Sequence, residues 1–588
     1  MPTPDTDLPA TEWDLVVVGS GASGLCAAVT AAWHGLRVLV LEKAPVLGGA
    51  TAWSGGWMWI PGNPLARRAG IEEDPRAPRT YLAHTLGRHY NAELIDAFLD
   101  NGPAMVSFLE GNTAVQFTAG NAIPDVYGHT PGAAAGGHQI IARAFDARTI
   151  PHLLPRLRKT MRETAFFGMP IAAGPDLAAF LSLTRSWRSF LHVVKRLSRH
   201  ALDMARHGRA THLVNGVALI ARLAKSASDL GVTMATDMAV AGLESDGGKI
   251  TGVRISTAQG TTTIRARRGV VLACGGFPND IARRQALFPR TPTGREHLAL
   301  PPASCAGDGI SLGEQAGGHL VTDLASPVAW APVSLLRHAD GSSGHFPHII
   351  DRGKPGIIGV LQTGKRFCNE ADGYYDYTAA MVAQAPQGAE VASWLICDQR
   401  FQRRYGLGHS RPFPVPVGPW VRRGYLERAP SIAALARQCG IDPAALTATV
   451  ERFNSFARQG EDPDFGRGGT AYNRRNGDPL HDGPNPCVAP IEKGPFYAVK
   501  VQPGCFATFS GLRTNGAAQV LDEKAAPIPG LYAVGADMAS VMGGCYPSGG
   551  INLGPAMTFG FIAGRHAAQA EAANAEPEAM TLDEHFAI

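Results

Sequence analysis

The chain has 588 residues, a hydrophobic content of 45% and a formal net charge of +4. It is too long for one ordinary domain, and its composition is that of a soluble globular protein. The small net charge does not indicate a nucleic-acid partner, and no apolar run approaches the length of a membrane span. The acidic, proline-containing N-terminus does not read as a secretory signal, so we expect a cytoplasmic protein. The 9 cysteines and 19 histidines show no paired or metal-ligand spacing, so neither a disulfide framework nor a metal site is predicted.

A strand, a glycine turn and a helix are predicted near the start of the chain. The apolar run Leu15–Val18 leads directly into Gly19, Gly21 and Gly24, and an Ala-rich helical pattern follows. Gly19 permits the tight turn, Gly21 lets a pyrophosphate approach the backbone, and Gly24 lets the helix pack close to the strand. The N-terminus of the helix would face the phosphates with free N–H groups and the positive end of its dipole. This pattern predicts a dinucleotide-binding domain.

A second strand and a distant acidic segment indicate which dinucleotide is bound. Val38–Leu41 ends at Glu42, whose carboxylate would accept hydrogen bonds from an adenosine ribose. Small residues follow at once and can lie along a diphosphate and a flavin edge. Far along the chain, Gly530–Asp537 predicts a buried strand that ends in an acid suited to the ribitol chain, and a helix opens at Gly554. A site in two parts of this kind is the pattern of FAD-binding flavoproteins. The predicted cofactor-binding residues are Gly19, Gly21, Ala22, Ser23, Gly24, Glu42, Lys43, Gly49, Ala50, Thr51, Ser54, Gly55, Gly56, Ala239, Ala273, Gly275, Asp537, Asn552 and Leu553.

Residues 150–208 form a separate block with strong helical periodicity. Its arginines and lysines interleave with large apolar side chains, among them Trp187, Phe190 and Leu191. Two interpretations compete. In one, the block is a surface helical hairpin whose apolar residues pack on the protein and whose basic face is solvated. In the other, an interfacial helix rests on anionic lipid and makes peripheral membrane contact, with its aromatic side chains in the interface and its arginines on phosphates.

The remaining pattern predicts two domains. Trp57–Pro64 is aromatic and turn-rich, and we expect a loop near the cofactor; Ala92–Gly111 predicts a helix. Residues 290–494 are richer in Pro, Tyr and charged residues and lack a second dinucleotide fingerprint, so they are expected to form an inserted substrate domain. The predicted fold is therefore α/β. A Rossmann-like FAD-binding domain would span residues 1–289 and 495–588, with the helical insertion at 150–208 and an α+β substrate domain at 290–494.

Several motifs together resemble one superfamily. They are VVGSGASG at Val17–Gly24, EKAPVLGGATAWSGG at Glu42–Gly56, ACGGF at Ala273–Phe277, GDGI at Gly307–Ile310, GKRFCNE at Gly364–Glu370 and GLYAVGAD at Gly530–Asp537. The chain resembles the fumarate reductase/succinate dehydrogenase flavoprotein superfamily along nearly its whole length. Within that superfamily it is most similar to the 3-ketosteroid dehydrogenases.

Two positions argue against fumarate as the substrate. In fumarate reductases a catalytic arginine lies five residues after the asparagine of the RFCNE-like segment, whereas here Tyr374 follows Asn369 at that spacing. These enzymes also carry an arginine in the late flavin loop, but residues 543–554 contain no cation. A dicarboxylate would therefore enter without its bidentate partners.

The resemblance to ketosteroid dehydrogenases implies a catalytic set of Tyr374, Tyr546, Gly550 and Tyr127. It implies that the Tyr546 hydroxyl and the Gly550 N–H bind the substrate carbonyl oxygen, and donors of this kind favour the developing enolate. Tyr374, supported by Tyr127, would remove the proton alpha to the carbonyl while FAD N5 accepts hydride from the beta carbon. Ser548 departs from the glycine-rich run expected for 1,2-dehydrogenation, so a 4(5α)-type regiochemistry stays open. The neighbouring Tyr375 stays an alternative to Tyr374.

Cofactor attachment and electron acceptor complete the expectations. Family members that tether FAD use a histidine soon after the second glycine motif, and Ala50–Ser54 contains none, so noncovalent FAD is expected. Electrons would leave to an external acceptor such as a quinone. The expected function is desaturation of a 3-ketosteroid, with 1,2-dehydrogenation as the expected regiochemistry. The alternatives are desaturation of a smaller cyclic ketone and the reverse reduction of an enone.

Overall fold

The computed structural model describes residues 10–257 and 260–569. A mainly parallel sheet, in the order β21-β22-β11-β1-β2-β8, forms the first domain, and β9 and β10 extend it beside β11. Its strands are β1 (Glu12–Val18), β2 (Val38–Leu41), β8 (Thr233–Ala235), β9 (Val240–Asp246), β10 (Lys249–Thr257), β11 (Gly260–Leu272), β21 (Gln519–Leu521) and β22 (Pro527–Ala533). β1 runs parallel to both β2 and β11. This arrangement confirms the predicted Rossmann-like domain.

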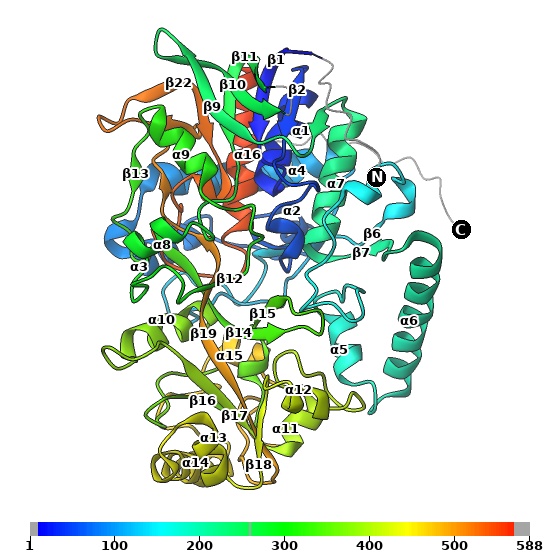
Figure 1. The fold of residues 1–588 in the computed structure, drawn as a ribbon, viewed down its shortest axis with the longest axis vertical. Coiled ribbons are helices and arrows are strands. Elements are labelled where there is room, and N and C mark those ends of the chain that lie inside the picture. Colours follow the sequence, from blue (N-terminus) through cyan, green and yellow to red (C-terminus); the bar gives the residue numbers. More distant parts are fainter. Residues whose placement is uncertain (1–9, 258–259, 570–588) are drawn as a thin grey trace.

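Helices α1 (Ala22–Trp33) and α16 (Leu553–Ala568) pack against this sheet in the upper half of the molecule (Figure 1). Helix α7 (Asn215–Asp229) packs on α1, and α4 (Ala92–Asn112) packs on α16. Residues 22–31 of α1 are all buried, as expected of a helix that is apolar all round. Two glycines of α16 allow its close approach to α1. A Cβ on Gly560 would lie 2.4 Å from the Ser23 carbonyl oxygen, and one on Gly564 would lie 2.6 Å from the Ala27 carbonyl oxygen.

A second, seven-stranded sheet in the order β15-β14-β19-β17-β16, with β12 and β18 also on β19, forms the lower part of the molecule (Figure 1). Its strands are β12 (Leu298–Ala299), β14 (Val328–Arg337), β15 (Ser343–Pro347), β16 (Ile357–Leu361), β17 (Ser393–Cys397), β18 (Glu427–Ala429) and β19 (Phe496–Thr508). The mixed α/β class with an α+β substrate domain is confirmed. The predicted boundaries stay predictions, although β19 continues the second sheet beyond residue 494.

Several shorter elements complete the chain. Trp57–Trp59 forms strand β3, which pairs with β5 (Gln139–Ala142), and β5 also pairs with β4 (Phe117–Ala119). The expected loop at Trp57–Pro64 is therefore a strand in its first part. The other helices and strands are α2 (Pro64–Arg68), α3 (Ala77–Leu86), α8 (Ile281–Leu287), α9 (Asp308–Gln315), α10 (Tyr374–Gln384), α11 (Gln399–Arg404), α12 (Gly418–Arg422), α13 (Ile432–Cys439), α14 (Pro443–Ala457), α15 (Ala471–Asn476), β13 (Leu320–Val321) and β20 (Gly511–Leu512).

The helical insertion leaves and rejoins the body at one place. β6 (Phe145–Asp146) pairs antiparallel with β7 (His212–Leu213), and between them lie α5 (Pro175–Leu181) and α6 (Trp187–His207). α6 stands at the right edge of the molecule, with α5 beside it (Figure 1). Several large apolar side chains of α6 are exposed, so the interpretation in which they pack on the protein is wrong. Among the residues described, no helix is long and apolar enough to cross a membrane.

Candidate active site

The glycine turn after β1 has the geometry of a phosphate-binding loop. Gly19 has φ +111°, and a Cβ there would lie 2.2 Å from the Ala273 carbonyl oxygen. A Cβ on Gly24 would lie 2.2 Å from the Gly19 carbonyl oxygen, so α1 and the turn meet backbone to backbone. Gly21 differs, because the nearest atom to its Cβ would be Thr51 Oγ1 at 3.8 Å. The space in front of Gly21 therefore stays open, as a pyrophosphate requires.

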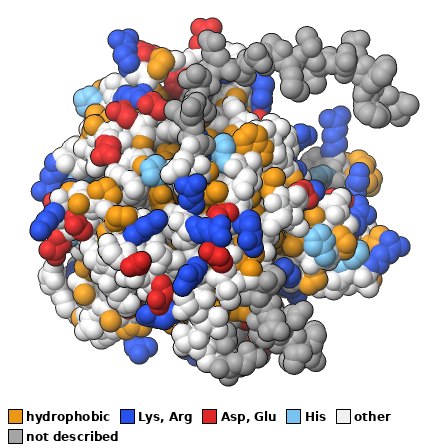
Figure 2. Space-filling view, turned by 90° about the horizontal axis from the view of Figure 1, so that it is seen from above, with side chains coloured by type: hydrophobic (Ala, Val, Ile, Leu, Met, Phe, Trp, Pro, Cys, Tyr) orange, Lys and Arg blue, Asp and Glu red, His pale blue; other side chains and the backbone are white. Residues whose placement is uncertain are grey.

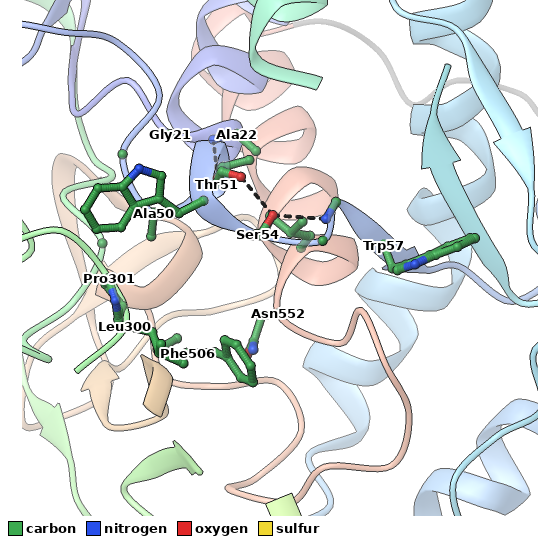
Figure 3. Close-up of a pocket in the computed structure, with 18 of the residues that line it drawn as sticks. Gly21, Ala22, Ala50, Thr51, Ser54, Trp57, Leu300, Pro301, Phe506 and Asn552 are labelled. Atoms are coloured by element: carbon green, nitrogen blue, oxygen red, sulfur yellow. Dashed lines mark hydrogen bonds between the residues drawn. The ribbon is translucent and has the colours of Figure 1, made fainter. Parts of the chain in front are cut away.

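Glu42 ties this turn to the segment that follows β2. Its buried carboxylate accepts hydrogen bonds from the Ser20 N–H at 3.1 Å and the Ser20 hydroxyl at 2.6 Å. The same carboxylate accepts the Ala44 N–H at 2.9 Å, and Ser20 Oγ accepts the Gly48 N–H at 3.0 Å. At the start of α1, the Ala22 N–H donates to Thr51 Oγ1 at 3.1 Å (Figure 3). These hydrogen bonds join the two glycine-rich segments at one edge of the site.

One continuous cavity of about 600 Å³ joins the predicted cofactor residues to the predicted catalytic residues. Thr51, Ser54 and Trp57 of one segment and Asn552 of a distant one lie around it (Figure 3). The predicted residues that line it are Gly19, Gly21, Ala22, Ser23, Glu42, Lys43, Gly49, Ala50, Thr51, Ser54, Gly55, Gly56, Ala273, Gly275, Tyr374, Tyr546, Gly550, Asn552 and Leu553. Gly24, Ala239, Asp537 and Tyr127 lie outside its lining.

Asp537 lies behind the cavity wall. Its buried carboxylate accepts hydrogen bonds from the Cys274 N–H and, at 2.9 Å, from the Gly276 N–H. Burial raises the pKa of Asp537 to about 6. In this structure the carboxylate holds the glycine turn after β11, and ribitol binding by Asp537 stays a prediction.

Tyr374 and Tyr546 form a hydrogen-bonded pair at the cavity. Their hydroxyl oxygens are 2.7 Å apart, and Asn552 Nδ2 donates to the Tyr546 oxygen at 3.3 Å. Tyr374 is the first residue of α10 and packs its ring against Phe506, with ring centres 5.1 Å apart. Burial raises the pKa of Tyr374 and the pKa of Tyr546 above the usual range of a phenol. Both phenols are therefore neutral at rest.

Only glycine fits at position 550. It has φ +90°, and a Cβ would lie 2.8 Å from backbone atoms of residues 57–59. Within the described chain its N–H makes no hydrogen bond, while its carbonyl accepts from the Trp59 N–H. A free donor at the cavity wall suits a carbonyl oxygen. Ser548, by contrast, is buried outside the cavity lining, and its hydroxyl accepts from Gln139 Nε2 at 2.9 Å.

The other two tyrosines point elsewhere. The Tyr375 hydroxyl donates to the Gly544 carbonyl at 3.0 Å, and the Tyr127 hydroxyl donates to Asp376 Oδ1 at 2.8 Å. Neither side chain lines the cavity. Support of Tyr374 by Tyr127 therefore stays a prediction for which this structure offers no direct contact.

The structure adds lining residues that sequence reasoning missed. Lys354 and Arg475 reach the cavity from distant segments, and Leu177 and Leu181 of α5 form part of its wall. Lys354 Nζ donates to the Gly477 carbonyl at 2.7 Å. Burial, and then the nearby Arg475 charge, lower the pKa of Lys354, while Asp478 acts in the opposite direction. Nothing in the spacing of these residues along the chain indicates that they share a site.

Comparison with known proteins agrees with this geometry. The model of the FAD binding domain family matches residues 14–553. The chain is 40% identical over 557 residues to 4-oxocyclohex-2-ene-1-carboxylate 5-dehydrogenase of Sinomonas cyclohexanicum, covering 95% of this chain and 94% of that protein. It is 36% identical over 568 residues to 3-oxosteroid 1-dehydrogenase of Mycobacterium tuberculosis, covering 95% and 98%.

A solved structure is similar as well. It is 3-ketosteroid delta1-dehydrogenase from Sterolibacterium denitrificans in complex with 1,4-androstadiene-3,17-dione, with a TM-score of 0.87 and 33% identity, covering 95% of this chain and 100% of that one. The open turn at Gly21 and the two glycine-rich segments fit the FAD that this family binds. The chain therefore belongs to the family of FAD-dependent flavoprotein oxidoreductases that includes the 3-ketosteroid dehydrogenases.

Proposed function

We propose that this enzyme desaturates a cyclic ketone next to its carbonyl group. FAD supplies the hydride acceptor, so the substrate loses an alpha proton and a beta hydride and gains a carbon–carbon double bond. The observation that carries the proposal is the Tyr374–Tyr546 pair beside the free Gly550 N–H, on the wall of the cofactor cavity. Noncovalent binding of FAD remains the expectation.

Each group has a role that its position supports. The Tyr546 hydroxyl and the Gly550 N–H would hold the carbonyl oxygen and stabilise the negative charge that develops there, a contribution of about 10²–10³ in rate per donor. Tyr374 would take the alpha proton. Since burial raises the pKa of Tyr374, its tyrosinate is a strong base but a rare species. Tyr374 is the first residue of α10, and negative charge near a helix N-terminus is favoured by the helix dipole.

A 3-ketosteroid is the first candidate substrate, with 1,2-dehydrogenation as the regiochemistry. The cavity that holds the tyrosine pair is also lined by apolar residues, including Leu177, Leu300 and Ile349, which suit a fused-ring skeleton. The relatives named for this reaction, at 36% and 33% identity, support the same choice. A quinone is proposed as the external electron acceptor.

A small oxo acid is the second candidate substrate. Lys354 and Arg475 put two neighbouring cations on the wall of an otherwise largely apolar cavity, and Arg475 forms no ion pair with a described residue. A carboxylate on the ring would bind between them. The relative at 40% identity is named for a 4-oxocyclohexene carboxylate, which supports this alternative.

Anaerobic flavin bleaching separates the candidates. Purified yellow enzyme is mixed with androst-4-ene-3,17-dione, 4-oxocyclohexanecarboxylate, cyclohexanone or fumarate, and the flavin absorbance is followed. We expect bleaching by a ketone and none by fumarate. Bleaching by the steroid alone favours the first candidate, and bleaching by the oxo acid alone favours the second. If no ketone bleaches the flavin, the desaturase proposal is wrong.

A further inference from the structure

Helix α6 turns its apolar side away from the protein. Trp187, Phe190, Leu191 and Val194 are 71%, 41%, 49% and 42% exposed. Their spacing of three, four and seven residues places them on one face of the helix. An ordinary surface helix buries such a face against its own domain, so the orientation of α6 is reversed.

Polar contacts hold the opposite side of α6 against α5 and against the segment that leads into β7. The carboxylate of Asp176 in α5 forms a hydrogen bond with His192 Nε2 at 2.6 Å and an ion pair with Arg196 at 3.3 Å. Near the other end, buried Asp203 accepts the Thr211 N–H at 3.0 Å and the Thr211 hydroxyl at 2.9 Å. Because these contacts hold α6 at two places along its length, the outward apolar side is a built feature of the fold.

The charges around the apolar side have one sign. Arg188, Lys195 and Arg206 are exposed beside it, and none of them forms an ion pair in the part of the chain that is described. The only carboxylate of α6 is the buried Asp203. Apolar and cationic side chains lie together on the projecting edge at the right of Figure 2. A second α6 packed on this face would bring cations against cations, whereas anionic phosphates would neutralise them.

We propose that α6 docks the enzyme on an anionic lipid bilayer, with its apolar side in the interface and its cations on lipid phosphates. The position of the cavity agrees with this role. α5 packs against α6 and contributes Leu177, Ala178 and Leu181 to the cavity wall. Docking would thus bring the cavity close to the phase in which an apolar ketone and a quinone dissolve. The docking itself does not depend on which ketone is the substrate.

Vesicle flotation of the holoenzyme tests the proposal. We expect the protein to float with vesicles that contain phosphatidylglycerol at low salt, to leave them at high salt, and to bind phosphatidylcholine vesicles weakly. Each cation near an anionic surface strengthens binding roughly fivefold, so Arg188→Glu should weaken it roughly 25-fold. Trp187→Ser should also weaken it. The matched changes Arg437→Glu and Trp33→Ser, at exposed sites on other elements, should leave it unchanged.

Three results would overturn the proposal. The protein could remain unbound by every vesicle, or Arg188→Glu could float as well as the wild type. It could also fail to bind vesicles and instead form a dimer in sedimentation velocity, with Trp187→Ser remaining a monomer. That result would make this face an interface between two copies of the chain. Flavin content and thermal midpoint are measured for every variant, so a misfolded variant is recognised. Flavin bleaching by the dissolved ketone should be the same in all of them.

Discussion

Valine in place of Gly21 tests the cofactor site without disturbing the fold. Gly21 has φ −68° and ψ 178°, a conformation open to any residue, and no atom would lie closer than 3.8 Å to its Cβ. We therefore expect the free energy of unfolding of the FAD-free protein to change by less than about 1 kcal/mol. The valine methyl groups would occupy the space in front of the turn. Loss of two charge-assisted hydrogen bonds to the pyrophosphate, at about 1.5–3 kcal/mol each, lowers FAD affinity by roughly 10²–10⁴-fold.

Gly19→Ala is the matched comparison. It would place a Cβ 2.2 Å from the Ala273 carbonyl oxygen at φ +111°, so we expect it to fail to fold. The assays are flavin absorbance per protein after gel filtration and thermal melting beside FAD-stripped wild type. A Gly21→Val protein that keeps full FAD would refute the assignment of the turn, and one that unfolds like Gly19→Ala would refute its geometry.

Other predictions concern catalysis, selectivity and pH. Tyr546→Phe should keep FAD and reduce the rate of flavin reduction by about 10²–10³, with the Gly550 N–H left as the remaining donor. Arg475→Ser should raise KM for 4-oxocyclohexanecarboxylate at least tenfold and leave KM for the steroid unchanged. The control Arg437→Ser should change neither KM. Equal KM changes for both substrates in Arg475→Ser would contradict an anion site. Burial raises the pKa of Asp376 from 3.8 to about 7. The contribution of protonated Asp376 to the free energy of unfolding is fully present below about pH 3.8 and is lost as pH rises through 7, by roughly 4 kcal/mol in all. Denaturant titrations at pH 5 and pH 8 measure this loss, and Asp376→Asn should make it smaller.

The parts of the fold that depend on local geometry could be predicted from the sequence. Gly19 and Gly24 are needed because backbone atoms within or beside the same turn approach closely. The strands on either side of α1 follow from short apolar runs that end in glycine or Glu42. Tyr374 and Tyr546, which the family resemblance implied as partners, lie in contact although they are 172 residues apart.

The parts that depend on tertiary contacts could not be predicted. Periodicity shows which residues of α6 share a face, but it does not show which way that face points. The direction follows from Asp176 and Asp203, which tie the polar side to α5 and to the segment before β7. The apolar pattern of β19 likewise does not specify a partner, and hydrogen bonds to β14 and β17 place this strand in the second sheet. Lys354 and Arg475 become neighbours only when their segments fold together.

The central claim is that Tyr374 removes the alpha proton. The most direct test is single-turnover flavin reduction by androst-4-ene-3,17-dione, or by the oxo acid if that is the substrate, in Tyr374→Phe and Tyr375→Phe over pH 7 to 10. Since the Tyr375 hydroxyl donates to Gly544 outside the cavity lining, we expect Tyr375→Phe to stay within about tenfold of the wild type. Tyr374→Phe should bind substrate and perturb the flavin spectrum, yet its flavin should remain oxidised. The wild-type rate should rise with pH, because burial places the pKa of Tyr374 above its usual range of about 10. If the flavin of Tyr374→Phe were reduced at the wild-type rate while the flavin of Tyr375→Phe stayed oxidised, the claim would be contradicted.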